Sequence, residues 1–428
     1  MSSESLNDAA WQKLFDKYNI LQAVESKGFF NISATQIKEF REPRLMAKFD
    51  HAKNLPLLFS KNKLSILPIT RGDYIIAHFD AYHTFEPSNS DVTKVSLPSH
   101  IQSLDSSNIS SEAIALNCAA ASGIIEDFIE DSDIFSTVSG RMGSGNFSFN
   151  IFDNSTGSTR QVNVNNSQVE IDAAYEGSAC LAIFEAKRDL ADDFLIRQLY
   201  YPFRIWKERI TKPVKPIFLI YSNGIYRLFE YAFDDVNNYG SLYLTKQKNY
   251  TVEDVSISVA DIQSVLDKAV LVEEPNISFP QADNFARVIN ICELVSTQEL
   301  SRSDVTERYD FDVRQTNYYT DAARYLGLLG KRKDSGTTLY HISDQGQRIL
   351  RLNFKQRQLA YCKAILSHRV FYQALRSYFG SGVMPSVEAI VEIMQHAELY
   401  NIGKDSTFER RASTVRGWLN WIVSLIDS

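Results

Sequence analysis

Two apolar stretches that each end in a carboxylate constrain the fold of this 428-residue chain most strongly. The first ends at Asp172, and the second begins at Cys180 and ends in Glu185-Ala186-Lys187. Side chains alternate across a β-strand, so Glu185 and Lys187 lie on the same face. A short connection between the two strands would bring Asp172 beside that face. We therefore expect two carboxylates and one amine to converge where neighbouring strands end.

A convergence of acidic oxygens suits a hard divalent cation. Mg²⁺ takes oxygen ligands and prefers one or two carboxylates together with phosphate and water. A cation held in this way stabilises charge on a phosphodiester and lowers the pKa of its bound water. The simpler alternative is a solvated strand end, since an acid-x-Lys triplet also occurs at Glu25-Ser26-Lys27, in a stretch with helical character.

The context of these residues resembles the PD-(D/E)xK nuclease superfamily. Asp172, Glu185 and Lys187 match its three core positions, and Ile171 replaces the proline of the motif, which carries no chemistry. The resemblance implies that Asp172 and Glu185, helped by the backbone carbonyl of Ala186, hold Mg²⁺. It also implies that Lys187 orients or deprotonates the attacking water and balances charge on the scissile phosphate.

The likeness extends over about residues 110 to 235 and is closest to type II restriction endonucleases. It includes the glycine-containing segment 139–149 before the two strands and the segment 197–204 after them. In such enzymes a glutamine on the helix after the strands lies near the metal cleft, and here that residue is Gln198. The resemblance implies Mg²⁺-dependent cleavage of double-stranded DNA that leaves a 5′-phosphate.

The remaining pattern of residues 111–272 predicts an α/β core in which helices flank a mixed sheet. A helix is expected from Ser111 to Ile129, with Ser111 as its cap, and a second from Asp192 to Lys207, which Pro202 should end or kink. The dipeptide Asn223-Gly224 between two apolar runs predicts a hairpin. A carboxylate on the first core helix often joins the metal in this class, and Glu112 and Glu126 are the candidates; the alternative for each is a surface charge.

Residues 1–110 are expected to flank the core and to help grip or read DNA. A helix is predicted over 11–24, and a hairpin over 64–69 and 74–79 around the turn Arg71-Gly72-Asp73. The composition of 86–111 predicts a loop or linker.

Residues 281–353 resemble a winged helix-turn-helix. Helices are expected over 285–295, over 303–309 with Ser303 as the cap, and over 312–328, followed by a basic hairpin that leads into a strand at 338–342. In that module the third helix enters the major groove of DNA. The alternative is a winged helix that serves in dimerisation or packing. Residues 354–428 form a second helical module in which another winged helix is possible.

The candidate DNA contacts are polar and basic side chains that pair with base edges or phosphates. They are Arg141, Arg314, Gln315, Asn317, Lys331, Arg332, Arg410, Arg411 and Arg416. The three arginines after residue 400 lie off the apolar stripe that carries Trp418, which is expected to face the core.

The formal net charge of −7 is unusual for a DNA-binding protein, but it is unevenly distributed. Residues 281–428 carry 19 Lys and Arg against 16 Asp and Glu, so the later part is basic. Local charge governs binding more than the total does. The four cysteines are far apart in the sequence, the first residues lack a signal-peptide pattern, and no apolar run is long enough to cross a membrane. We therefore expect a cytoplasmic protein.

The sequence as a whole predicts a type II restriction endonuclease, a site-specific deoxyribonuclease with Mg²⁺ as its cofactor. Cutting two antiparallel strands with one site per chain favours a homodimer. Two alternatives stay open. One is a PD-(D/E)xK endonuclease that cuts only methylated or otherwise modified DNA, and the other is a non-catalytic winged-helix DNA-binding regulator.

Overall fold

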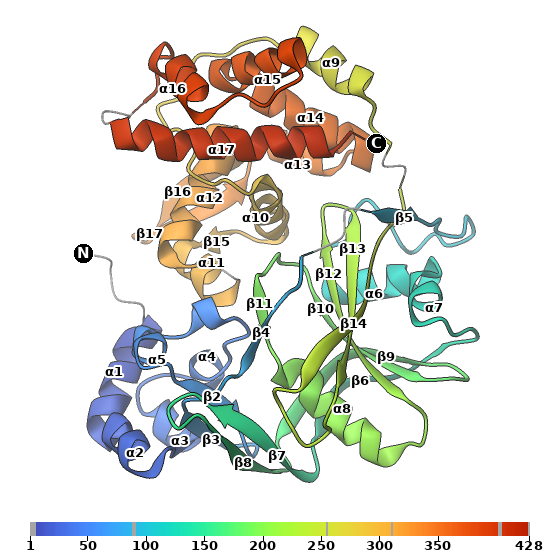
Figure 1. Ribbon diagram of the computed structural model, residues 1–428, viewed down its shortest axis with the longest axis vertical. Helices are drawn as coiled ribbons and strands as arrows, with labels where there is room; N and C mark the ends of the chain where they lie inside the picture. Colours follow the sequence, from blue (N-terminus) through green and yellow to red (C-terminus); the bar gives the residue numbers. More distant parts are fainter. Residues whose placement is uncertain (1–5, 88–90, 254–255, 310, 401–404, 427–428) are drawn as a thin grey trace.

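The computed structural model describes residues 6–87, 91–253, 256–309, 311–400 and 405–426. Residues 1–5, on which the expectation about a signal peptide partly rests, lie outside these ranges. Figure 1 shows three parts: an N-terminal part, a central mixed sheet flanked by helices, and a C-terminal helical part across the upper end of both. The coarse α/β expectation is confirmed. Within the described ranges, every helix is too short or too polar to cross a lipid bilayer.

The N-terminal part packs short helices around a small antiparallel sheet whose strand order is β1-β3-β2. The predicted hairpin is confirmed, because β2 pairs with β3 around the turn at 69–72. The predicted single helix is wrong: Asn19 has a φ of 49° and separates two helices. The elements are α1 (Leu6–Tyr18), α2 (Ile20–Lys27), β1 (Phe30–Ser33), α3 (Ala34–Lys38), α4 (Pro43–Met46), η1 (Ala52–Asn54), α5 (Leu57–Lys61), β2 (Ser65–Pro68), β3 (Asp73–Ala77) and β4 (Tyr82–Thr84).

The central sheet has seven strands in the order β5-β14-β13-β12-β10-β9-β6. It is mixed, because β10 runs antiparallel to β9 and parallel to β12. The hairpin predicted at Asn223-Gly224 is confirmed by the antiparallel pair β12 and β13. The strands are β5 (Val92–Lys94), β6 (Phe135–Gly143), β9 (Gln168–Glu176), β10 (Leu181–Lys187), β12 (Val214–Ser222), β13 (Ile225–Phe233) and β14 (Leu242–Thr251).

Helices cover both faces of this sheet. On one face α6 (Glu112–Ala121) and α7 (Ile124–Ile129) share a buried cluster with alternate residues of the strands, among them Phe184. On the other face α8 (Arg197–Arg209) packs into a second cluster that contains Ile183. Ser111 caps the first helix as expected, but the predicted continuous helix is broken at Gly123, whose φ is 76°.

The helix predicted from Asp192 begins later than expected. Residues Asp193–Leu195 form β11, which pairs with β4, so α8 starts at Arg197. Pro202 lies inside α8 without ending it. The chain also forms a separate two-stranded sheet from β7 (Asn146–Asp153) and β8 (Ser158–Asn165), which joins the N-terminal part where the Asn165 N–H donates to the carbonyl of Ile69 at 2.7 Å.

The C-terminal part begins with helix, strand, two helices and two strands. The strand order is β15-β17-β16. The cap of α11 is Ser301 rather than the predicted Ser303, and Asp312 caps α12. The elements are α10 (Phe285–Thr297), β15 (Leu300–Ser301), α11 (Arg302–Arg308), α12 (Val313–Tyr325), β16 (Leu329–Asp334) and β17 (Thr337–Ile342).

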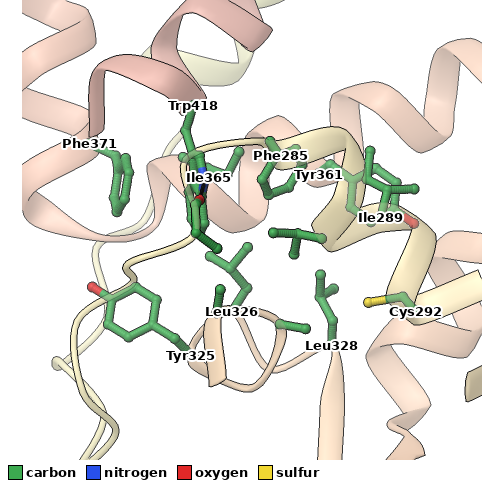
Figure 2. Close-up of a cluster of buried hydrophobic side chains, with 14 of the residues drawn as sticks. Phe285, Ile289, Cys292, Tyr325, Leu326, Leu328, Tyr361, Ile365, Phe371 and Trp418 are labelled. Atoms are coloured by element: carbon green, nitrogen blue, oxygen red, sulfur yellow. Dashed lines mark hydrogen bonds between the residues drawn. The ribbon is translucent and has the colours of Figure 1, made fainter. Parts of the chain in front are cut away.

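The helices that follow β17 share one hydrophobic core with the elements from α10 to β17. Figure 2 shows side chains of α10, α12, α14, α15 and α17 converging, with Phe285 and Trp418 among them. Trp418 is fully buried, as the apolar stripe predicted. In the described part of 354–426 the chain forms helices and no strand, so the second winged helix considered for this segment has no strand pair there. These helices, with α9 before them, are α9 (Val259–Asp267), α13 (Asp344–Leu350), α14 (Phe354–Leu366), α15 (Arg369–Ser381), α16 (Val387–Gln395) and α17 (Asp405–Ser424).

Candidate active site

A cleft of about 190 Å³ opens at the C-terminal end of β10, beside the first half of β9 and the start of α8. Asp172 does not end its strand as expected, because β9 continues to Glu176. Six of the predicted site residues line it: Asp172, Glu185, Lys187, Gln198, Glu112 and Arg141. The strands contribute the first three of them, α8 contributes Gln198, and the N-terminus of α6 contributes Glu112. Segments that are distant in the sequence therefore bring carboxylates, amines and an amide to one place.

The register of the two strands places the carboxylates. Phe184 of β10 pairs with Ala173 of β9, and continuing this antiparallel register by one position sets Glu185 opposite Asp172. The Asp172 carboxylate also accepts a hydrogen bond from the backbone N–H of Ala186 at 2.8 Å. The ladder between the strands thus fixes both acids, and Asp172 points toward β10 rather than away from it.

Glu185 lies at the centre of the polar contacts in the cleft. Its Oε1 accepts hydrogen bonds from Lys187 Nζ and, at 2.7 Å, from Gln198 Nε2. The side chain is only 11% exposed. Burial raises the pKa of Glu185 to about 7, and the neighbouring charge of Asp172 adds to this effect, while the Lys187 ammonium opposes it. Glu185 therefore exchanges its proton near neutral pH.

The other titratable groups of the cleft are shifted as well. Burial by itself disfavours the charged form of Lys187, but four carboxylates, chiefly Glu185 and Asp50, outweigh it and raise its pKa well above the usual value. Burial raises the pKa of Asp172 and of Glu112 despite the attraction of Lys187. Lys187 is thus a permanent cation among acids that are reluctant to ionise together.

The donor set fits a cation that keeps part of its hydration. In the described residues, no group of three His, Cys, Asp or Glu side chains is arranged to hold a metal unaided. Glu112 lines the cleft but does not complete such a group. Among the described residues, the buried Oε1 of Gln198 and Oδ1 of Asp50 have no hydrogen-bond partner, so the cleft contains oxygens free to accept a ligand. Two strand carboxylates, a backbone carbonyl, water and phosphate match the preference of Mg²⁺.

The N-terminal part supplies cleft residues that sequence reasoning did not single out. Arg44, Lys48 and Asp50 line the cleft, and Asp50 faces Lys187 closely enough to shift its pKa. The Lys187 charge, with Lys48 and His51, in turn keeps the pKa of Asp50 below its usual value although burial acts to raise it. The segment from Arg44 to Asp50 is rich in charged residues around the buried Phe49. This concentration of charge was the one sequence signal that could have pointed to these cleft residues.

The segment that follows Lys187 is fixed by both neighbouring parts of the chain. From the C-terminal part, buried Asn290 of α10 accepts from the Leu190 N–H at 3.0 Å and donates to the Arg188 carbonyl at 2.7 Å. From the N-terminal part, buried His51 contacts Asp189 through Nε2 at 3.2 Å and the carbonyl of Asp193 through Nδ1 at 2.6 Å. Residues 188–193 therefore form a junction between three parts of the protein.

Arg141, at the edge of the cleft, pairs with Glu170 at 3.3 Å. The other predicted side chains lie outside the cleft. Glu126 is exposed on α7 and does not line it. Gln315 accepts from the backbone N–H of Asp312 as part of a helix cap, and Arg332 forms a two-pronged ion pair with Glu299.

The remaining candidates for DNA contact are distributed over the C-terminal part. Arg314, Lys331, Arg410 and Arg416 are exposed, and Asn317 is partly exposed on α12. Arg411 is half-buried, and its Nε and Nη1 atoms have no hydrogen-bond partner. Burial, together with the charge of Arg410, lowers its pKa.

Three families match consecutive parts of the chain, and each is described only as a domain of unknown function. They are DUF6996 over residues 8–76, DUF6997 over residues 77–251 and DUF7226 over residues 287–427. Searches of the curated proteins and of the solved structures returned no match. The second match contains Asp172, Glu185 and Lys187, the first contains Asp50, and the third contains Asn290.

Asn290 offers a direct test of the junction. Asn290→Ala removes the hydrogen bonds to the carbonyl of Arg188 and from the N–H of Leu190, and we expect it to lower the free energy of unfolding by about 1–3 kcal/mol. Asn420→Ala, at an exposed position on α17, is the matched control and should change it by less than about 0.5 kcal/mol. Urea denaturation followed by circular dichroism measures both. Equal stability of the two variants would contradict the role assigned to Asn290.

Proposed function

We propose that this protein is a Mg²⁺-dependent endonuclease of the PD-(D/E)xK type that cleaves double-stranded DNA. One observation carries the proposal: Asp172 of β9 and Glu185 and Lys187 at the end of the adjacent strand β10 line a single cleft. A solvated strand end, the simpler alternative, would leave these groups exposed. Instead the Glu185 and Lys187 side chains are 11% and 13% exposed, and burying charge has a cost that function explains best.

The architecture supports the same class. The mixed sheet with α6 and α7 on one face and α8 on the other is the arrangement expected for such a core. The order helix, strand, two helices and a terminal strand pair from α10 to β17 is the order expected of a winged helix. A nuclease core joined to a DNA-binding module fits site-specific cleavage, and a homodimer would place two such cores on the two strands.

Each residue of the cleft has a task in this proposal. Asp172 and Glu185 would hold Mg²⁺, with the carbonyl of Ala186 as a further ligand. When bound, the cation activates water and neutralises charge on the phosphate. Lys187 stays protonated because its pKa is raised, so it donates a hydrogen bond to the phosphate or orients water rather than accepting a proton. Gln198 fixes the rotamer of Glu185 through its amide.

The winged-helix unit would supply recognition. Arg314 is exposed in the first turn of α12 and Asn317 follows one turn later, where side chains of a recognition helix reach base edges. Lys331 on the exposed strand β16 would contact phosphate. Gln315 and Arg332 contribute less in this proposal, because the helix cap and Glu299 already engage their side chains.

The primary test is incubation of unmethylated plasmid with the protein and Mg²⁺. We expect discrete fragments from the wild type and a rate at least about 10²-fold lower from Lys187→Ala and Asp172→Asn, because each removes a group that acts on the reacting phosphate. Lys207→Ala, an exposed lysine on α8 outside the cleft, is the matched control and should cut normally.

The same assay separates the alternatives. Cleavage restricted to methylated plasmid would replace the proposal with a modification-dependent endonuclease. Binding of DNA without cleavage under any divalent cation would contradict catalysis and favour a regulator. Cleavage that survives Lys187→Ala would exclude this cleft as the active site.

The pKa of Glu185 gives a test that needs no turnover. Its pKa of about 7 lies above the usual value, so the carboxyl is mostly protonated at pH 6 and mostly ionised at pH 8. The proton must leave before the carboxylate can hold Mg²⁺, so the apparent affinity should fall about tenfold from pH 8 to pH 6. Calorimetry in buffers of different ionisation enthalpy measures the affinity and the released proton. Glu185→Gln should abolish this dependence and exposed Glu126→Gln should retain it; a flat profile in the wild type would contradict the assignment.

The recognition unit is tested on the Lys187→Ala protein, with a DNA site selected from a random library. Arg314→Ala or Asn317→Ala should weaken binding to that site by about 1–3 kcal/mol and leave binding to random DNA nearly unchanged. Lys331→Ala should weaken both equally, and Arg332→Ala should have the smallest effect. Fluorescence anisotropy measures all four. Loss of both kinds of binding in Asn317→Ala would contradict base recognition by α12.

A further inference from the structure

A second hollow, of about 360 Å³, adjoins the catalytic cleft. The two share Arg44, Lys48, Arg141, Glu170 and Arg197 in their walls, so they are continuous. From these residues the second hollow extends over the turn between β2 and β3 and along the N-terminal end of β9. We call it the N-terminal groove, because most of its length is built by residues 43–74.

The charge of the N-terminal groove is strongly one-sided. It is lined by five cations, Arg44, Lys48, Arg71, Arg141 and Arg197, and by a single acid, Glu170. Two of the cations have acidic partners within the described residues: Arg141 pairs with Glu170 at 3.3 Å, and Lys48 pairs with Asp50 at 3.6 Å. Arg44 and Arg71 are exposed and form no ion pair within the described residues. This contrasts with the negative total of residues 1–280 and places a row of cations next to the catalytic acids.

The backbone that carries these cations is held firmly. Around α4, the Trp11 indole donates to the carbonyl of Met46 at 3.0 Å, and the Tyr82 hydroxyl donates to that of Phe49 at 2.9 Å. At the turn beside Arg71, the Thr70 hydroxyl donates to Asp73 at 2.8 Å. Long cationic side chains on a fixed backbone form a preorganised surface for a polyanion.

Gly143 at the end of β6 lies beside this region and allows a close approach. A Cβ at Gly143 would lie 2.2 Å from Oδ1 of Asn166, so a larger residue would displace that side chain. The same Cβ would lie 3.7 Å from the guanidinium of Arg71, an ordinary van der Waals contact.

We infer that the N-terminal groove binds the sugar–phosphate backbone of the DNA on one side of the scissile phosphate. The inference rests on the proposed function, because the groove leads directly into the catalytic cleft. A row of cations matches a repeating phosphate chain, and we assign these side chains to phosphates, so the proposed contact is independent of sequence. Residues 43–74 thereby position the bound DNA strand so that it continues toward Asp172 and Glu185.

The test measures how DNA affinity depends on salt. On the Lys187→Ala protein without divalent metal, a fluorescent mixed-sequence duplex is titrated at several KCl concentrations for the parent and for Arg44→Gln/Lys48→Gln/Arg71→Gln. The slope of log K against log [salt] is negative, and each lost phosphate contact reduces its magnitude by about 0.9. The magnitude of the slope for the triple variant should therefore be smaller than that of the parent by about 2 to 3. The control is Lys27→Gln/Lys38→Gln/Lys61→Gln, three exposed lysines of the same part outside the groove, and its slope should match the parent.

The outcomes separate this inference from the nuclease proposal. Equal slopes for the groove variant and the control would overturn the inference that the N-terminal groove binds DNA, even if the wild type cuts plasmid. A reduced slope in the groove variant would support the groove even if the wild type cuts nothing. A loss of slope seen with duplex RNA but not with duplex DNA would overturn the assignment of DNA as the ligand. Because the exchanged side chains are exposed, thermal unfolding should give the same Tm for all three proteins.

Discussion

The hydrogen bonds that Asn290 and His51 make to residues 188–193 are the constraint on which the rest of the site depends. These residues directly follow Lys187, so their position fixes where β10 ends and where its charged side chains point. The contacts come from opposite sides, one from the C-terminal part and one from the N-terminal part. The position of β10 is therefore not defined by the central sheet alone, and the three matched families meet structurally at this segment.

The electrostatics of the cleft follow from that arrangement. Several acids surround one buried lysine, and burial alone would disfavour every charge among them. Lys187 attracts its neighbours, yet burial outweighs this attraction and raises the pKa of Glu185 to about 7. Around the same cleft five cations, among them Arg44, Lys48 and Arg197, face five acids, so the ionised groups balance in number. The cost of burying charge is the reason that we place function rather than stability first in explaining this set.

The sequence made part of this site predictable. Alternation in two adjacent strands was enough to bring Asp172, Glu185 and Lys187 together, whereas Gln198 was singled out through the resemblance to PD-(D/E)xK enzymes. Asp50 could not be found in this way, because its place depends on tertiary contacts such as the hydrogen bond from the Leu195 N–H to its own carbonyl. Arg332 shows the reverse case: its residue type predicted a phosphate contact, and only the structure reveals Glu299 beside it. The local sequence pattern predicts helices and strands, but only the folded structure shows which side chains become partners of one another.

The same distinction explains how an acidic chain can offer a basic surface. Many acids of the first 280 residues hold loops in place: Asp131 accepts from the Ala179 N–H at 2.8 Å, and Asp127 binds Lys248 at 2.6 Å. These carboxylates are already engaged, and they contribute little to the field in the N-terminal groove. Arg44 and Arg71, by contrast, are exposed in that groove. The net charge counts the engaged carboxylates and the exposed arginines together, whereas a phosphate chain bound in the groove would contact only the arginines.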